Sequence, residues 1–165
     1  FNILGPLTNP ANAKQQVLGV FNDDLVETLA LVLQRLGSRH VLIVNGKDGL
    51  DEITITGDTN VGELKNGRVE TYTIRPEDFN LQTSPIEAIQ VNDKEHAKSM
   101  LLSVLENAAG PARDIVLLNA GAAIYVSGIA DSLEHGIKTA HQAIESSAAL
   151  KKLHELIDIT HRNSN

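Results

Sequence analysis

The chain has 165 residues, enough for one domain with its own hydrophobic core. Hydrophobic residues make up 42% of it and charged residues 21%, a composition that excludes wholesale disorder. The formal net charge is −7, and the densest basic spot is Lys151-Lys152. Proteins that bind nucleic acid need a basic surface to displace phosphate counterions, so we expect no nucleic-acid partner.

The chain contains no cysteine, which excludes disulfides, thiolate metal sites and cysteine nucleophiles. No apolar run reaches the roughly 20 residues that span a bilayer. The most apolar stretch, 115–129, is too short and is interrupted by polar residues. We therefore expect a cytoplasmic protein with no membrane partner. The chain opens at Phe1 without an initiator methionine, and we expect it to be a fragment of a longer protein.

Residues 1–10 contain a Gly-Pro and an Asn-Pro dipeptide, which predict an ordered loop. A short apolar segment follows at 17–21. Next comes a helical pattern that Asn22 can cap and Gly37 can end. The run of β-branched and aliphatic residues at 41–44 is typical of a strand buried on both faces, as in a parallel sheet. Helix followed by strand predicts an α/β fold, with a central sheet and flanking helices.

A polar loop, 45–52, follows that strand and ends in Asp51-Glu52. In open α/β sheets, ligands bind at the carboxyl ends of the strands, which is where this loop would lie. Residues 53–55 are expected to be extended. The Asn66-Gly67 dipeptide before 68–74 predicts a hairpin with a type I′ turn.

The rest of the chain reads as helical. Asn92 and Glu95 resemble a capping box, and Gly110-Pro111 should end the helix that they begin. The small residues of the next helix predict close approach to a neighbour, and its polar Asn119, Tyr125 and Ser127 are interpreted as packing or local hydrogen-bonding residues. The later helices are expected at 112–129, from a cap at Asp131 to 146, and from 148 to about 161.

Asp51 and Glu52 are the first candidates for chemistry. Mg²⁺ prefers carboxylate oxygens and is usually completed by water and substrate phosphates. Two adjacent acids in a glycine-bearing loop could hold such an ion, although an acidic turn exposed to solvent has the same sequence. The 5–10 stretch, which begins Gly5-Pro6, could approach a ligand closely or could be an ordinary loop. The chain has no GxGxxG or GxxxxGK[ST] motif, and its histidines show no metal-ligand spacing.

Three stretches, read together, resemble anthranilate phosphoribosyltransferases. They occur in the order found in that family, and the similarity runs through the whole chain. The stretches are FNILGPLTNPA at 1–11, DGLDEI at 48–53 with the following Gly57 and Thr59, and NAGAAIYVSGIADSLEHGIKTAHQAIES at 119–146.

The resemblance implies a large α/β domain like that of nucleoside phosphorylases and phosphoribosyltransferases. Residues 1–165 would be the C-terminal portion of this domain, and so a partial domain. The helical N-terminal domain and the glycine-rich GTGGD-type loop of the family would lie upstream of Phe1. Members transfer the 5-phosphoribosyl group from phosphoribosyl pyrophosphate to anthranilate and release pyrophosphate, in tryptophan biosynthesis. The full-length enzyme is expected to be a homodimer.

The resemblance also implies roles for four residues. Asp51 and Glu52 match the acidic pair that holds one of two magnesium ions through the diphosphate. Gly5 and Pro6 match the Gly-Pro beside the anthranilate channel. No catalytic residue is expected in this chain, and the fragment is expected to be inactive alone. Two alternatives remain: a nucleoside phosphorylase of the related fold, and a non-catalytic relative that binds nucleic acid, which the charge of −7 disfavours.

Overall fold

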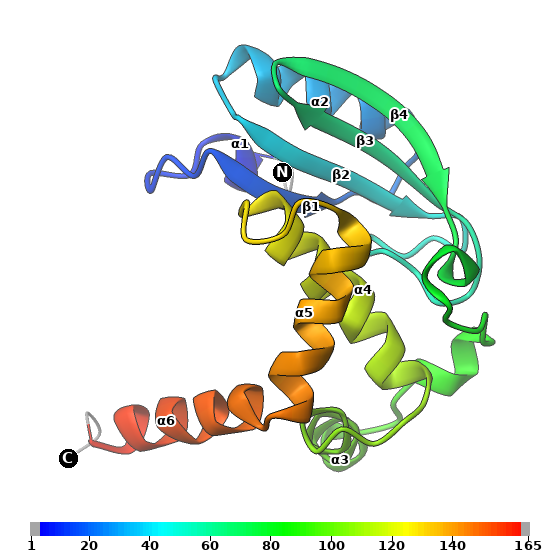
Figure 1. Ribbon diagram of the computed structural model, residues 1–165, viewed down its shortest axis with the longest axis vertical. Helices are drawn as coiled ribbons and strands as arrows, with labels where there is room; N and C mark the ends of the chain where they lie inside the picture. The colour runs from blue at the N-terminus through cyan, green and yellow to red at the C-terminus, as the bar shows by residue number, and fades with distance from the viewer. Residues whose placement is uncertain (1–3, 163–165) are drawn as a thin grey trace.

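The computed structural model describes residues 4–162, which form a four-stranded sheet with helices on both faces (Figure 1). The strand order is β1-β2-β3-β4, with β1 parallel to β2 and the other neighbouring pairs antiparallel. The expected α/β fold is confirmed, but the sheet is mixed rather than parallel throughout. The strands are β1 (Gln15–Gly19), β2 (His40–Gly46), β3 (Thr59–Lys65) and β4 (Arg68–Ile74).

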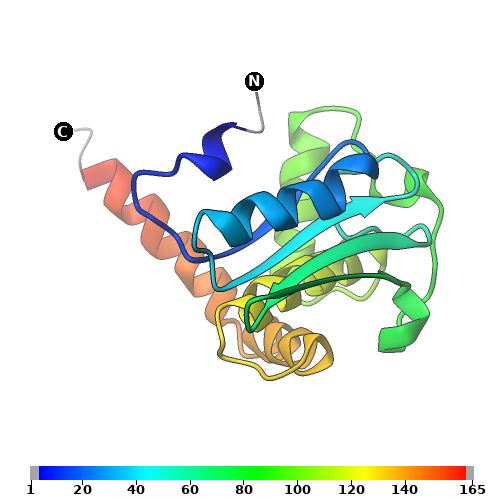
Figure 2. The same ribbon diagram turned by 90° about the horizontal axis from the view of Figure 1, so that it is seen from above.

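Strand β2 is buried along its whole length, as its aliphatic sequence predicts. Successive side chains of a strand point to opposite faces of the sheet. Val41 and Ile43 therefore pack with helix α2 (Asp24–Arg35), whereas Leu42 and Val44 pack with helix α4 (Pro111–Val126). One strand thus joins two hydrophobic cores. Figure 2 shows α2 and the later helices on opposite sides of the sheet.

Strands β3 and β4 form the predicted hairpin. Asn66 and Gly67 both have positive φ, 52° and 74°, as a type I′ turn requires.

Two other expectations from the sequence need correction. Residues 53–55 are buried but pair with no strand: the chain bends at Ile55, and Thr54 donates its N–H to the hydroxyl of Thr59. Of the loop expected at 1–10, residues 1–3 lie outside the described part of the chain, and the remainder contains one helical turn, α1 (Leu4–Leu7).

The helix starts differ slightly from the sequence expectation. Asp93, not Asn92, caps α3 (Lys94–Leu105), and Ser132, not Asp131, caps α5 (Leu133–Glu145). Each side chain accepts the N–H of the residue three positions later. A one-residue choice between adjacent polar residues depends on backbone angles, which the sequence pattern does not encode. The remaining elements are α6 (Ala148–Arg162) and the short helices η1 (Pro76–Phe79) and η2 (Ile86–Ile89).

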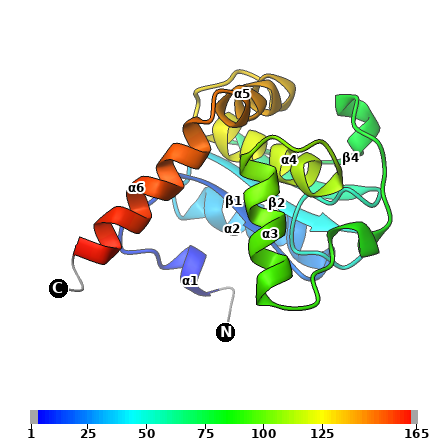
Figure 3. The ribbon, with the colours of Figure 1, turned by 90° about the horizontal axis from the view of Figure 1, so that it is seen from below.

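Helix α4 is closely packed against α5, as its small residues predict. A Cβ at Gly136 would lie 2.2 Å from the carbonyl oxygen of Gly121, so only glycine fits at this crossing. Helix α6 then extends beyond the rest of the molecule (Figures 1 and 3). Within residues 4–162, no helix is both long and apolar enough to cross a bilayer.

Candidate functional site

The loop between β2 and β3 is closed by its own main chain. Gly46 donates its N–H to the carbonyl of Leu50 at 2.9 Å, and Lys47 donates to the carbonyl of Asp58 at 3.0 Å. Gly49 has a φ of 97°, a conformation that other residues rarely adopt. The acidic dipeptide is therefore carried by a folded loop directly after the buried strand β2.

The side chain of Asp48 stabilises this loop by hydrogen bonds within it. Its carboxylate accepts hydrogen bonds from the hydroxyls of Thr54 (2.5 Å) and Thr56 (2.6 Å) and from the N–H of Leu50 (3.0 Å). Partial burial opposes ionisation of Asp48, but the hydrogen bonds from the two threonines and from the main chain together outweigh it and hold the pKa below its usual value. Asp48 is thus a structural acid, distinct from the two that follow.

Asp51 and Glu52 are exposed, and among residues 4–162 no hydrogen bond or ion pair engages either carboxylate. Removal of water by nearby protein atoms raises the pKa of Glu52, and the adjacent negative charge of Asp51 raises it further. No set of three or more potential metal-binding side chains occurs in the described part of the chain. The pair is therefore not a complete metal cage, but it supplies two hard oxygen donors facing solvent.

Directly after this pair, the chain returns to the body at Ile53. The side chain of Asn119, on α4, accepts the N–H of Ile53 at 2.9 Å and donates to its carbonyl at 2.8 Å. The local hydrogen bonding expected of Asn119 is confirmed by its 3.0 Å bond to the carbonyl of Ile115, but its two bonds to Ile53 are long-range. Its partner, 66 residues earlier in the chain, could not be identified from the sequence pattern.

Gly5 and Pro6 lie in α1, where Thr8 donates both its N–H and its hydroxyl to the carbonyl of Leu4. A Cβ at Gly5 would meet nothing within 4 Å. Figures 1 and 2 show α1 well apart from the loop after β2, and no described hydrogen bond joins the two segments. The structure therefore does not bring the two predicted pairs together.

A second polar cluster, which the sequence did not predict, lies between the sheet and α4. Glu63 on β3 accepts hydrogen bonds from Tyr125 (2.6 Å) and Tyr72 (2.9 Å), and its carboxylate lies 3.0 Å from Nε2 of His40. Lys65 donates to the hydroxyl of Tyr125 at 2.8 Å. The alternation of polar and apolar residues in β3 could have suggested part of this cluster: Glu63 and Lys65 point toward α4, whereas Leu64 between them packs with the core under α2.

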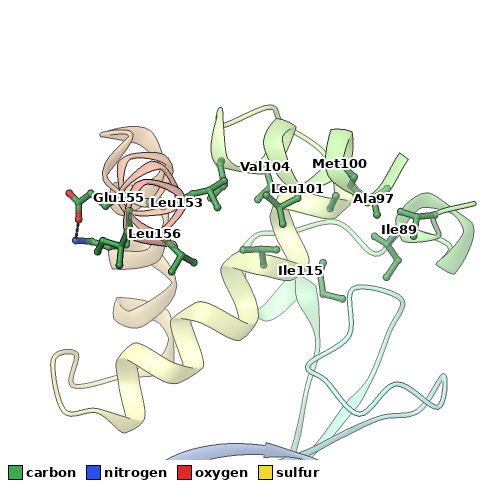
Figure 4. A pocket seen from close by; sticks show the side chains of 16 residues that line it. Ile89, Ala97, Met100, Leu101, Val104, Ile115, Leu153, Glu155 and Leu156 are labelled. Carbon is green, nitrogen blue, oxygen red and sulfur yellow. Dashed lines mark hydrogen bonds and ion pairs between the residues drawn. The ribbon is translucent and has the colours of Figure 1, made fainter. Parts of the chain in front are cut away.

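An apolar groove of about 910 Å³ lies where α3, α4 and α6 meet. Figure 4 shows Leu101, Ile115 and Leu156 lining it from these three helices. Its charged lining residues, Lys152 and Glu155, pair with each other at 2.5 Å. The groove offers no free cation for a diphosphate, so its chemistry suits a protein surface rather than a phosphorylated substrate.

The fold agrees with a comparison to known families. The family model described as the a/b domain of the glycosyl transferase family matches residues 1–150, and the chain therefore belongs to that family.

Within the family, the chain is similar to anthranilate phosphoribosyltransferases, as the resemblance predicted. It is 59% identical to the enzyme of Nitrosospira multiformis over 99% of this chain and 48% of the relative. It is 60% identical to that of Thiobacillus denitrificans over 95% of this chain and 46% of the relative. The chain spans about half the length of the curated relatives it matches.

Solved structures give the same picture. The anthranilate phosphoribosyltransferase of Thermus thermophilus superposes with a TM-score of 0.83 at 36% identity, covering 93% of this chain and 45% of that one. The Saccharomyces cerevisiae enzyme in complex with phosphoribosyl pyrophosphate and Mg gives 0.81 at 28% identity, covering 95% and 46%. The fold of this chain is thus that of about half of each of these proteins.

Proposed function

We propose that this chain is the C-terminal part of the α/β domain of an anthranilate phosphoribosyltransferase. The complete enzyme, a cytoplasmic homodimer in this proposal, would transfer the 5-phosphoribosyl group of phosphoribosyl pyrophosphate to anthranilate and release pyrophosphate. The observation that carries the proposal is the pair of exposed carboxylates, Asp51 and Glu52, presented at the carboxyl end of β2. Identity of 59% to a relative with that name supports it.

The donor set of the pair fits magnesium bound together with a diphosphate. Mg²⁺ is usually held by one or two carboxylates, with waters and substrate phosphates completing the octahedron. Asp51 and Glu52 supply two such carboxylates, and mutual repulsion between their charges is relieved when a cation lies between or beside them. A yeast relative solved with phosphoribosyl pyrophosphate and Mg supports the choice of ion.

The reaction is a displacement at the anomeric carbon of the ribose. Bound magnesium would offset the negative charge that builds up on the leaving diphosphate. Asp51 and Glu52 would bind and orient the metal-diphosphate, and neither would need to carry a proton. The amine of anthranilate is neutral near pH 7, so its position matters more than proton removal. Gly5 and Pro6 would lie beside anthranilate, and the phosphate-binding loop would come from residues outside this chain.

The test is a magnesium-dependent assay of the full-length protein with anthranilate and phosphoribosyl pyrophosphate. The double variant Asp51→Ala/Glu52→Ala should lower turnover by about 100-fold or more, the loss typical when a group that stabilises transition-state charge is removed. The matched control is Glu87→Gln/Asp158→Asn, which also removes two exposed carboxylates, on η2 and α6, and should leave turnover unchanged.

Two results would count against the proposal. Unchanged turnover and magnesium dependence in the Asp51→Ala/Glu52→Ala variant would remove the metal role of the pair. Phosphorolysis of nucleosides without magnesium, together with no anthranilate activity, would favour a nucleoside phosphorylase instead. The 165-residue chain alone is expected to show no transferase activity.

A further inference from the structure

The acidic pair lies between two fixed points of its main chain. On one side, β1 ends at Gly19 beside Asp51, and on the other, Ile53 is paired to Asn119. Neither contact involves a carboxylate. Both contacts fix the main chain that orients the carboxylates of Asp51 and Glu52.

Asn119 holds Ile53 as a neighbouring strand would. One amide side chain pairs with both the N–H and the carbonyl of this residue, and its Nδ2 also donates to the carbonyl of Ile115 within α4 at 3.0 Å. Ile53 itself is 1% exposed and belongs to the core beneath the sheet. The peptide that follows Glu52 is therefore fixed in direction by α4.

Gly19 fixes the opposite side. A Cβ built on it would lie 1.6 Å from the carbonyl oxygen of Asp51 and 2.5 Å from its carbonyl carbon. These are main-chain atoms, so no side-chain rotation could relieve the collision, and any larger residue must push the loop away from β1. The end of β1 thus sets how closely the Asp51 peptide approaches the sheet.

We propose that Asn119 and Gly19 are positioning residues for a magnesium-diphosphate site formed by Asp51 and Glu52. The proposal rests on the function proposed above for that pair. Groups that orient metal ligands typically change metal affinity by 10- to 100-fold when they are replaced. Asn119 and Gly19 act on the ligand backbone from two different elements, α4 and β1, so their substitutions should give the same kinetic signature independently.

The test uses the full-length protein and two variants, Asn119→Ala and Gly19→Ala. Each should raise the apparent KM for Mg²⁺ by about 10- to 100-fold, with a smaller change in kcat at saturating Mg²⁺. Calorimetric titration with magnesium pyrophosphate should show a matching loss of affinity without turnover. If Gly19→Ala does not fold, Asn119→Ala carries the test alone.

The matched control is Tyr125→Phe, which also weakens the contact between α4 and the sheet but leaves the acidic loop untouched. It should lower thermal stability without changing the KM for Mg²⁺. An equal rise in the KM of this control would overturn the positioning role, because the effect would then follow from general loosening of α4. An unchanged Mg²⁺ requirement in Asn119→Ala would overturn it as well.

These outcomes are separable from failure of the proposed function. If the Asp51→Ala/Glu52→Ala variant retains normal magnesium dependence, the metal site itself is wrong and the positioning role falls with it. If that variant loses magnesium dependence whereas Asn119→Ala and Gly19→Ala do not, only the positioning role is wrong.

Discussion

The hydroxyl of Tyr125 on α4 donates a 2.6 Å hydrogen bond to the carboxylate of Glu63 on β3. The same hydroxyl accepts from Lys65, and the ring of Tyr125 meets His40 edge to face with centroids 4.6 Å apart. One side chain therefore joins α4 to two strands of the sheet, at the half-buried edge of an otherwise aliphatic core.

Loss of this hydroxyl should destabilise the fold. In the full-length protein, Tyr125→Phe is expected to lower the free energy of unfolding by about 1–3 kcal/mol, because a partly buried carboxylate loses one of its donors. Denaturant titration measures the change. Ser146→Ala, which removes an exposed hydroxyl with a long 3.5 Å contact, is the control and should change stability little. Equal values for the two variants would contradict a structural role for the Tyr125 hydroxyl.

The same carboxylate should make stability depend on pH. Burial opposes the charge of Glu63, but hydrogen bonds from Tyr125, Tyr72 and His40 outweigh it and keep the pKa below its ordinary value. A depressed pKa stabilises the folded state above the pKa of the unfolded chain, and this contribution disappears as the pH falls through the folded value.

The comparison is between wild type and Glu63→Gln in denaturant titrations from neutral to acid pH. Their difference in unfolding free energy should be largest at neutral pH and shrink below the ordinary range of a glutamate pKa. His40 and Lys65 remain in both proteins, so the difference reports the Glu63 carboxylate together with its interactions with these two side chains. A difference that grew toward acid pH would contradict the sign of the Glu63 shift.

The hairpin turn offers a backbone test. Gly67→Ala should destabilise the protein by about 1–2 kcal/mol, because a residue with a Cβ is strained in the left-handed region. The φ of Gly67 is 74°, and its carbonyl accepts a hydrogen bond from Gln34 on α2 at 2.8 Å. Thermal unfolding of Gly5→Ala is the control, since a Cβ there meets nothing within 4 Å. A Gly67→Ala protein as stable as the control would rule out the turn strain.

The apolar groove predicts association of the 165-residue chain. Leu101 and Leu156 in the groove are 50% and 58% exposed, and apolar patches of this kind usually mark contact surfaces. Sedimentation velocity should show oligomers at micromolar concentration that Leu156→Asp reduces. Leu36→Asp places the same charge on an exposed leucine outside the groove and should not reduce them. A monomeric wild-type chain would contradict the prediction.

The sequence predicted those elements whose pattern lies within a few neighbouring residues. The aliphatic run of β2, the Asn66-Gly67 turn and the small residues of α4 all describe interactions within a few residues or on one face. The mixed strand directions could not be predicted, because the burial of β2 on both faces does not distinguish a parallel neighbour from an antiparallel one. The helical turn at Leu4–Leu7 was not predicted either; in it, Thr8 donates both its hydroxyl and its N–H to the carbonyl of Leu4, although Gly-Pro is typical of loops.

Only part of the candidate site could likewise be predicted from the sequence. The adjacent acids at Asp51 and Glu52 could be found because carboxylates after a buried strand have an evident chemistry. The residues that hold them, Gly19 and Asn119, could not be found, because their contacts span distant parts of the chain and involve main-chain atoms. A lone glycine at the end of a strand and an asparagine in an apolar helix have no pattern that reveals their partners.

Because the side chains of β3 alternate between the two faces of the sheet, the structure disfavours a wrong register between β3 and β2. A slip of one residue against β2 would turn every β3 side chain to the other face of the sheet. Glu63 would then point into the aliphatic layer beneath α2, where the absence of a Cβ at Gly62 now lets the helix main chain approach closely. A misaligned hairpin would thus bury a charge and lose space for α2 at once, so the register that carries the acidic loop is enforced by two independent penalties.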